Sequence, residues 1–445
     1  MDLLPPSSRE EDHTSTSSPI DAEQKPTKLF SIGSIIVPLR NRNFSLLFSG
    51  QLISNIGDLL YAVALPWFML SGGGGAQALG IVLAAYGIPR AASVLLGGVL
   101  SDRLRPRRTM LLTDTVRIFL MAALAFLVIQ GHPVLWSLCL VSTLLGLFGG
   151  LFIPASWSVT PSILSDEELQ AGNALTTSST QLAGVAGAGI AGIVVALLQP
   201  GGTLALDALT FVVSAVTLFF MHDVLASKAA STENTGENTD GTVAEPLTFW
   251  QLLRRSRMLQ IFFVLVVFMN LGNGAAFEVA LPALLHNQLH TSASGYGFVL
   301  AGFSVGAIIG AITAGGLGKI PYRLPFSLAC FFIEGVLITL LPFMGSVSIG
   351  VLIMVVAGVL NGLGNVVVLS IIQGQLPAHL MGRVMSVLAF ANFGLYPFSV
   401  AIAGIIVPRY GTISIFIATG LLIAVPCIVG CLQGSFWQRG EVRIM

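Results

Sequence analysis

Several side chains that could bind an ion or a polar substrate stand inside long apolar runs of this sequence. An ionisable side chain at the centre of a bilayer costs about 2.5 to 3.5 kcal/mol on insertion scales, so each one kept there needs a partner or a task. We single out five candidates for substrate binding or ion coupling. Asp58 and Arg90 lie early in the chain, and Asn270, Asn273 and Glu278 lie in its second half.

Asp58 and Arg90 lie in consecutive apolar runs and carry opposite charges. If the two runs are antiparallel helices, the two side chains lie within about two helical turns of each other in depth. Asp58 is then either a carboxylate that gains and loses a proton as its surroundings open and close, or half of a permanent ion pair that joins two helices. The sequence leaves both interpretations open.

Glu278 follows Asn270 and Asn273 in a later apolar run. In one interpretation it faces a central cavity and a cationic or hydrogen-bonding cargo. In the other it faces solvent near the membrane surface. Two further carboxylates lie in apolar runs, and we interpret Asp207 as structural and assign no transport role to Glu334.

The elements that must position these residues are membrane helices. Hydrophobic residues make up 54% of the 445-residue chain and charged residues 9%, and the mean hydropathy is +0.86, which leaves too little polar surface for a soluble protein. Apolar runs of about 20 residues predict twelve transmembrane helices. Their predicted starts lie near Phe44, Ala78, Thr109, Pro133, Asn173, Thr203, Gln260, Ser294, Leu324, Val347, Val384 and Thr412.

Lysine and arginine residues gather in alternate loops between the predicted helices. The intervening loops at residues 71–77, 131–133 and 199–202 contain neither residue type. Because positive charge favours the cytoplasmic side, this pattern places both termini in the cytoplasm and requires an even number of spans. We therefore expect a multi-pass protein of the cell membrane.

The chain divides into two halves that resemble each other. Residues 190–195 recur as 402–407, and Gly97-Gly98 recurs as Gly315-Gly316, at offsets of about 210 to 220 positions. Parallel repeats of this kind are expected to hold a substrate site at their interface, near the bilayer midplane. The predicted organisation is a disordered cytoplasmic tail with a short amphipathic segment at 1–40, a six-helix bundle at 41–224, a polar cytoplasmic linker at 225–250, a second six-helix bundle at 251–435 and a cytoplasmic tail at 436–445.

A dense group of charges separates the second and third predicted helices. It follows the loop pattern Gly-x-x-x-Asp-Arg/Lys-x-Gly-Arg-Arg/Lys, with the second glycine missing, through Gly98, Asp102, Arg103, Arg107 and Arg108. This pattern and the doubled six-helix plan resemble the major facilitator superfamily of secondary transporters. Segments 41–51, 206–211 and 382–386 extend the resemblance to the macrolide-efflux and enterobactin-exporter-like branch.

The resemblance implies an all-helical fold of two pseudo-symmetric bundles that works by alternating access. It implies a monomeric, proton-coupled exporter of a hydrophobic or amphipathic small molecule, of the drug, macrolide or siderophore class. In that superfamily a charge cluster latches the cytoplasmic gate, and here Asp114, Arg117 and Arg383 would join the loop residues. Charge that only sets the topology is the alternative.

A glycine pattern in the fifth predicted helix bears on the direction of transport. Exporters of the superfamily carry Gly-x-x-x-Gly-Pro-x-x-Gly-Gly there; Gly187, Gly189 and Gly192 match, but Ala188 stands in place of the proline. Uptake or lipid translocation therefore remains an alternative. We expect these glycines to serve close helix packing.

Three short motifs are typical of other functions, but they lie on predicted helices. Residues 187–192 read G-x-G-x-x-G without a preceding strand, and His286 and His290 lack the catalytic Glu of a zinc helix. Gly302, Gly306 and Gly310 repeat every four residues, which indicates helix packing and leaves a membrane-embedded hydrolase with Ser304 as the disfavoured alternative.

Without a Walker A loop, the chain is predicted to bind no nucleotide. We expect no enzymatic activity, no cofactor, no metal ion and no nucleic acid. The expected partners are a small-molecule substrate, protons and the lipid bilayer.

Overall fold

The computed structural model describes residues 37–72, 74–103, 106–131, 133–221, 257–316, 322–375 and 394–432. The predicted linker at 225–250, the tail at 436–445 and most of the tail at 1–40 lie outside these ranges. The candidate gate residue Arg383 and the predicted helix start at Val384 lie outside them as well.

Every regular element in the described ranges is helical. After a 3-10 turn at Val37–Arg40, the first half contains α2 (Arg42–Ser71), α3 (Gly75–Arg103), α4 (Pro106–Ile129), α5 (Leu135–Ile163) and α6 (Asp166–Phe220). The second half contains α9 (Arg257–Asn273), a π-helical segment (Gly274–Ala280), α10 (Leu281–Asn287), α11 (Ala293–Gly316), α12 (Arg323–Leu340), a 3-10 turn (Leu341–Phe343), α13 (Val347–Gln375) and α15 (Tyr396–Leu432).

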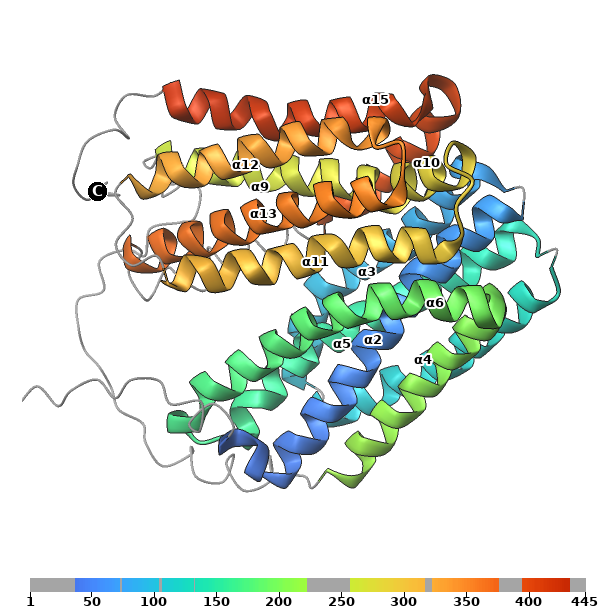
Figure 1. The fold of residues 1–445 in the computed structure, drawn as a ribbon. Helices are drawn as coiled ribbons and strands as arrows, with labels where there is room; N and C mark the ends of the chain where they lie inside the picture. The colour runs from blue at the N-terminus through green and yellow to red at the C-terminus, as the bar shows by residue number, and fades with distance from the viewer. Residues whose placement is uncertain are drawn as a thin grey trace, which may run out of the picture.

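Two of these helices are each interrupted by one residue with a non-helical backbone. The interruptions are Gln199 in α6, with φ 59°, and Gly411 in α15, with φ 78°. The ribbon of α6 doubles back within its length in Figure 1. Both positions coincide with predicted turns, just before the predicted helix starts at Thr203 and Thr412.

Nine helices in the described ranges are long and apolar enough to cross a membrane, and α6 and α15 are two of them. The all-helical membrane fold is therefore confirmed. The count of twelve spans stays a prediction, because the predicted eleventh start lies outside the described residues.

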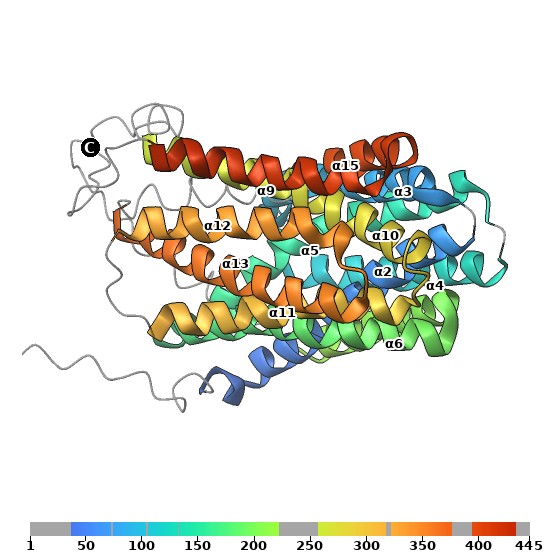
Figure 2. The ribbon, with the colours of Figure 1, turned by 45° about the horizontal axis from the view of Figure 1, so that its top comes forward.

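The helices form two bundles, α2 to α6 and α9 to α15, which diverge from one end of the molecule (Figure 1). The end that carries the turns at Gly72, Gly131, Gln199, Gly345 and Gly411 is called the short-turn end here, and the opposite end the linker end. The bundles meet at the short-turn end and separate toward the linker end (Figure 1). Between the bundles, α11 packs against α6 and α15 against α3 (Figure 2).

Two pairs of glycines make close contacts between the bundles. A Cβ atom added to Gly80 of α3 would lie 2.7 Å from the Cα of Gly404 in α15, and one added to Gly297 of α11 would lie 2.9 Å from the Cα of Gly192 in α6. Small residues let helix backbones approach this closely. Gly192 and Gly404 occupy the same position of the repeated segment, so the two contacts follow the internal repeat.

Glycines also set the packing inside the second bundle. Gly302, Gly306 and Gly310 of α11 lie against the backbone of α13 at Val351, Val355 and Val359. Added Cβ atoms would overlap these carbonyl groups, so the spacing of four residues serves the contact between α11 and α13. Ser304, within the same helix, donates to the carbonyl of Leu300 at 3.5 Å.

Candidate functional site

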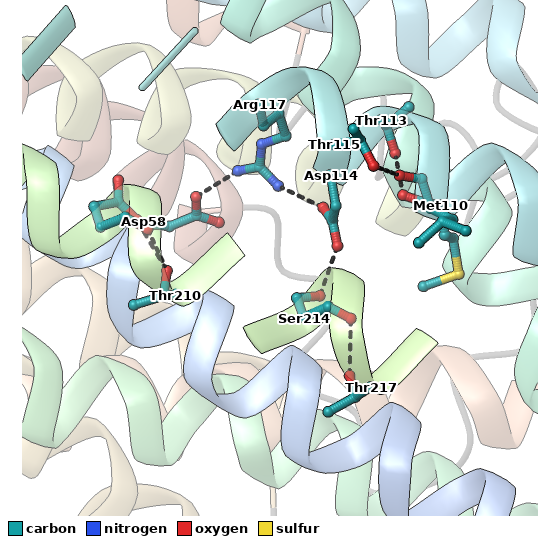
Figure 3. Close-up of polar contacts among 11 residues, drawn as sticks. Asp58, Met110, Thr113, Asp114, Thr115, Arg117, Thr210, Ser214 and Thr217 are labelled. Carbon is teal, nitrogen blue, oxygen red and sulfur yellow. Dashed lines mark hydrogen bonds and ion pairs between the residues drawn. The ribbon is translucent and has the colours of Figure 1, made fainter. Parts of the chain in front are cut away.

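An ion-pair network in the first bundle joins one arginine and two aspartates (Figure 3). Arg117 of α4 donates from Nη2 to Oδ1 of Asp58 in α2 at 2.6 Å. Its Nη1 lies 3.7 Å from Oδ1 of Asp114, one turn earlier in α4. A single guanidinium thus ties α2 to α4 in the middle of the bundle.

The network is buried on one side and accessible on the other. The side chain of Arg117 is 7% exposed and that of Asp114 is fully buried, whereas that of Asp58 is 41% exposed. Asp58 is therefore the carboxylate through which solvent or a ligand reaches the network.

The second segment of α6 closes the buried side. Ser214 donates to Oδ2 of Asp114 at 2.6 Å (Figure 3). The guanidinium carbon of Arg117 lies 3.8 Å from the ring centre of Phe211, a cation–π contact. Phe211 is fully buried, so the charge of Arg117 is held between two carboxylates and an aromatic face.

A third carboxylate, Asp207, lies behind this network. Its Oδ1 accepts from the Thr210 hydroxyl at 3.2 Å, but that hydroxyl also donates to the Asp207 carbonyl at 2.7 Å. Asp207 is fully buried, and within the described part of the chain its Oδ2 has no hydrogen-bond partner. The backbone of Gly57 packs directly against this carboxyl group, next to Asp58 in sequence.

The similar depths of Asp58 and Arg90 made an ion pair between them possible, whereas the structure pairs Asp58 with Arg117. Arg90 of α3 donates from Nη1 to the hydroxyl of Tyr86 at 2.9 Å. The ring of Tyr86 in turn lies 5.4 Å from that of Tyr61 in α2. Equal depth in two neighbouring helices was not enough, because the direction of each side chain around its helix decides the pairing.

Glu278 lies in the π-helical segment of the second bundle and is half-buried. Among the described residues it has no ion-pair or hydrogen-bond partner, but its charge acts on the hydroxyl groups of Tyr61, Tyr296 and Tyr396. Tyr61 belongs to the first bundle, so Glu278 faces the interface between the two bundles. The structure does not bring Glu278 to the ion pair of Asp58.

The two asparagines precede this segment on α9. Asn270 donates to the carbonyl of Val266 in its own helix at 2.8 Å. Asn273 is half-buried, and its Oδ1 has no hydrogen-bond partner in the described part of the chain. Ser399 and Thr419 of α15 donate to the carbonyls of Leu271 and Gly272. These bonds hold the chain where the α-helical hydrogen-bond pattern of α9 gives way to the π-helical pattern.

The charged loop residues are placed only in part. Gly98, Asp102 and Arg103 lie on the last turns of α3. Arg107 donates to the carbonyls of Leu218 and Phe219 at 3.0 and 2.7 Å, so it caps the end of α6, and Arg108 is exposed. Asp114 and Arg117 form an ion pair with each other, and their further contacts run to Asp58 of α2 and Ser214 of α6.

The glycines of the fifth predicted span serve different contacts. Gly187 lies against Leu59 of α2, inside the first bundle. Gly192 lies against α11 at the short-turn end, with an added Cβ 2.8 Å from the Ala293 carbonyl oxygen. Gly189 has room, since an added Cβ would lie 3.6 Å from that of Ala301.

The second bundle also holds a fully buried carboxylate away from the interface. Glu334 of α12 accepts from Nδ2 of Asn361 in α13, at 3.0 and 3.1 Å to its two oxygens. Asn361 in turn accepts from Asn365 at 2.9 Å. This chain of amides joins α12 to α13.

Sequence reasoning missed the part that α6 plays in the network. Asp207, Phe211 and Ser214 stand at positions i, i+4 and i+7, which places them on one face of a helix. Two polar residues on one face of an otherwise apolar run were a signal that could have pointed to a buried network. The pair His286 and His290 is not on one helix, because α10 ends at Asn287 and His290 has a φ of 47°.

Known membrane transporters resemble this chain both in sequence and in fold. The chain is 24% identical over 386 residues to the multidrug efflux pump Tap of Mycolicibacterium fortuitum, covering 84% of this chain and 92% of that pump. It is 24% identical over 345 residues to the enterobactin exporter EntS of Shigella boydii, covering 77% and 79%. The crystal structure of a bacterial homologue of the iron transporter ferroportin shares the fold, with a TM-score of 0.64, 17% identity and 88% and 99% coverage.

A family model, described as Major Facilitator Superfamily, matches residues 47–395 and 263–439. The match spans most of both bundles, and the related proteins are membrane transporters. The chain is accordingly a multi-pass membrane transporter and not an enzyme. It belongs to the Major Facilitator Superfamily.

Proposed function

We propose that the chain is a secondary active exporter that moves a hydrophobic or amphipathic small molecule by alternating access and is driven by protons. The observation that carries the proposal is the arrangement of the two bundles, which touch through paired glycines at the short-turn end and diverge at the linker end. Two rigid bundles with such a contact can exchange an opening at one end for an opening at the other.

The distribution of charge supports an orientation. Arginines near the linker end include Arg40, Arg107 and Arg257, so we place this end, both termini and the linker at 225–250 in the cytoplasm. The bundles at 41–224 and 251–435 then open toward the cell interior. An exporter collects its cargo in that arrangement, and we place the protein, as a monomer, in the cell membrane.

Five side chains are the proposed contacts for cargo or protons. Asp58, Arg90 and Glu278 supply charge, and Asn270 and Asn273 supply amides. Asp58 is half-exposed beside the buried Arg117, so its protonation would release the guanidinium from the ion pair. The drug and siderophore classes are suggested by the functions of the relatives, multidrug efflux and enterobactin export.

Charged residues and one glycine at the linker end, together with Asp114 and Arg117 inside the first bundle, form the proposed cytoplasmic latch. The resemblance to the superfamily adds Arg383 of the second half to this latch, and that residue lies outside the described ranges. The proposed latch consists of Gly98, Asp102, Arg103, Arg107, Arg108, Asp114, Arg117 and Arg383. Replacement of Asp102 by Asn is expected to slow transport and leave membrane insertion intact.

The test is efflux of a panel of dyes and antibiotics from cells that express the full chain, with and without a protonophore. We expect expression to lower the internal dye concentration and the protonophore to abolish this effect. The variant Asp58→Asn should resemble the protonophore-treated wild type. Accumulation of the dyes on expression, or export that is indifferent to the protonophore, would contradict export or proton coupling, respectively.

A further inference from the structure

Asp207 is a carboxyl group with almost nothing to stabilise a negative charge. It is fully buried inside a membrane-spanning helix. One shared hydroxyl hydrogen, from Thr210, reaches its Oδ1, and the better-placed acceptor of that hydrogen is the Asp207 carbonyl at 2.7 Å. Within the described part of the chain, Oδ2 has no hydrogen-bond partner. Burial of an ionised carboxylate without partners is strongly unfavourable.

The surrounding charges add to this difficulty. The charged groups that act electrostatically on Asp207 from the helices packed around it are Asp58 on α2 and Arg117 on α4, and the hydroxyl groups of Tyr61 on α2 and Tyr86 on α3 are in turn within reach of its charge. Arg117 is already engaged by Asp58 at 2.6 Å and by Asp114 at 3.7 Å. Three carboxylates therefore lie around one guanidinium, and full ionisation would leave this network with more negative than positive charge.

Glu334 in the other bundle is the instructive contrast. It is equally buried, but both of its oxygens accept from Asn361. Glu334 also has no second carboxylate hydrogen-bonded or ion-paired to the same partner in the described part of the chain. The excess of carboxylates over guanidinium groups is therefore a feature of the network around Arg117 in the first bundle, where Asp58 is exposed.

We propose that Asp207 is a proton-binding site of the transporter, occupied by a proton in the arrangement seen here. This inference rests on the proposed proton coupling and names the residue that stores the proton. Asp58 gives it access to water, since the backbone of Gly57 lies against the Asp207 carboxyl group and the next side chain is 41% exposed. When Arg117 leaves Asp58, the proton passes from a carboxyl oxygen of Asp207 to a carboxylate oxygen of Asp58, and Arg117 then compensates Asp207.

Infrared spectroscopy of the purified full chain tests the site without any knowledge of the cargo. The spectrum of the wild type minus that of Asp207→Asn at neutral pH should contain the carbonyl band of a protonated carboxylic acid. Thr210→Val, which keeps the carboxyl group and removes its hydroxyl donor, should change the frequency of this band without abolishing it. Carboxylate bands in the difference spectrum, or a band that Thr210→Val leaves unmoved, would overturn the assignment to Asp207.

Transport by liposomes that contain the protein tests the exchange of the proton. With ethidium as the probe, Asp207→Asn should lose accumulation driven by a pH gradient and keep the exchange of internal for external ethidium. Glu334→Gln is the matched control, with the same chemical change at equal burial, and it should keep both. Full accumulation by Asp207→Asn would overturn proton exchange at this residue.

The two measurements also separate this inference from the proposed function. A wild type that shows the protonated band but no response to the pH gradient would contradict proton coupling and leave the buried proton site standing. A wild type whose transport responds to the pH gradient but whose spectrum lacks the band would contradict the assignment of the proton to Asp207 and leave the proposed function intact.

Discussion

The two bundles treat charge inside the membrane differently. The first bundle gathers Asp58, Asp114 and Asp207 around Arg117, with fewer hydrogen bonds than the carboxylates need. The second bundle keeps its acids apart, with Glu334 bonded to Asn361 on both oxygens and Glu278 alone at the interface. Buried polar groups that are fully bonded hold one structure, whereas partly bonded groups respond to a proton or a ligand.

The internal repeat sharpens this contrast. Glu278 lies 220 positions after Asp58, close to the offset of the repeated glycines, so the two acids occupy corresponding places in the first helix of each half. Asp58 has an arginine partner and lies in a regular helix, whereas Glu278 lies in a π-helical segment and has no ion-pair partner among the residues that the structure describes. The two halves share one helix plan, but the first contains an ion pair that protonation can break. The second presents the carboxylate of Glu278 to a substrate that binds between the bundles.

The largest effect is expected for Arg117→Met. Removal of the guanidinium leaves Asp114 fully buried beside other carboxylates, and breaking a buried ion pair in this way costs about 3 to 5 kcal/mol. Thermal unfolding in detergent, followed by size-exclusion chromatography, should show a clear loss of stability. Arg323→Ala, at an exposed arginine at the start of α12, should show none. Equal melting of Arg117→Met and the wild type would refute a stabilising role of the network.

The glycine contact between the bundles predicts the next effect. Gly192→Ala places a Cβ 2.8 Å from the Ala293 carbonyl oxygen, so the short-turn end should open. Spin labels at Leu198 and Ser292 should report a longer distance in this variant. Gly189→Ala is the matched control, because its Cβ meets an ordinary contact at 3.6 Å. An unchanged distance in Gly192→Ala would show that this contact does not hold the end closed.

A smaller effect is expected for Asn361→Leu in the second bundle. The variant leaves the buried Glu334 without its donor, at a cost of about 1 to 3 kcal/mol. Stability in detergent should fall, and the dependence of transport on the pH gradient should not change. If Asn361→Leu changed the pH dependence of transport without lowering stability, the response to protons would not be confined to the first bundle.

The smallest effect is expected for Glu278→Gln. A half-exposed carboxylate interacts with a cationic probe by about 1 kcal/mol or less, equivalent to a change in KM of about fivefold or less. We expect the KM for ethidium to rise and the KM for an uncharged dye to stay constant. Equal changes for both dyes would argue against contact between Glu278 and the positive charge.

The helices could be predicted well from the sequence because apolar run length and turn residues act locally. Val347 is both the predicted and the observed start of α13, and the turns at Gln199 and Gly411 fall where they were expected. The resemblance to the superfamily is confirmed by the family match. The pairing of side chains is a different matter, since it depends on rotation about each helix and on contacts between helices far apart in sequence.

The network of Arg117 shows where this limit lies. Sequence spacing identified Asp114 and Arg117 as one turn apart, but Asp58 joins them across 59 positions and Ser214 joins Asp114 across 100. Asp207 was interpreted as structural from its place near the start of a predicted helix and its resemblance to a family position, and the sequence does not show how few donors its carboxyl group has. The unmatched charge becomes visible only when α2, α4 and α6 are assembled.

The account depends on separation of the bundles at the short-turn end, and one disulfide tests this directly. A Cβ at Gly189 lies 3.6 Å from that of Ala301, which suits a disulfide between α6 and α11. In a chain with its four native cysteines replaced, the pair Gly189→Cys and Ala301→Cys should stop dye efflux when oxidised and restore it on reduction. Undiminished efflux by the fully oxidised protein would contradict alternating access by these two bundles.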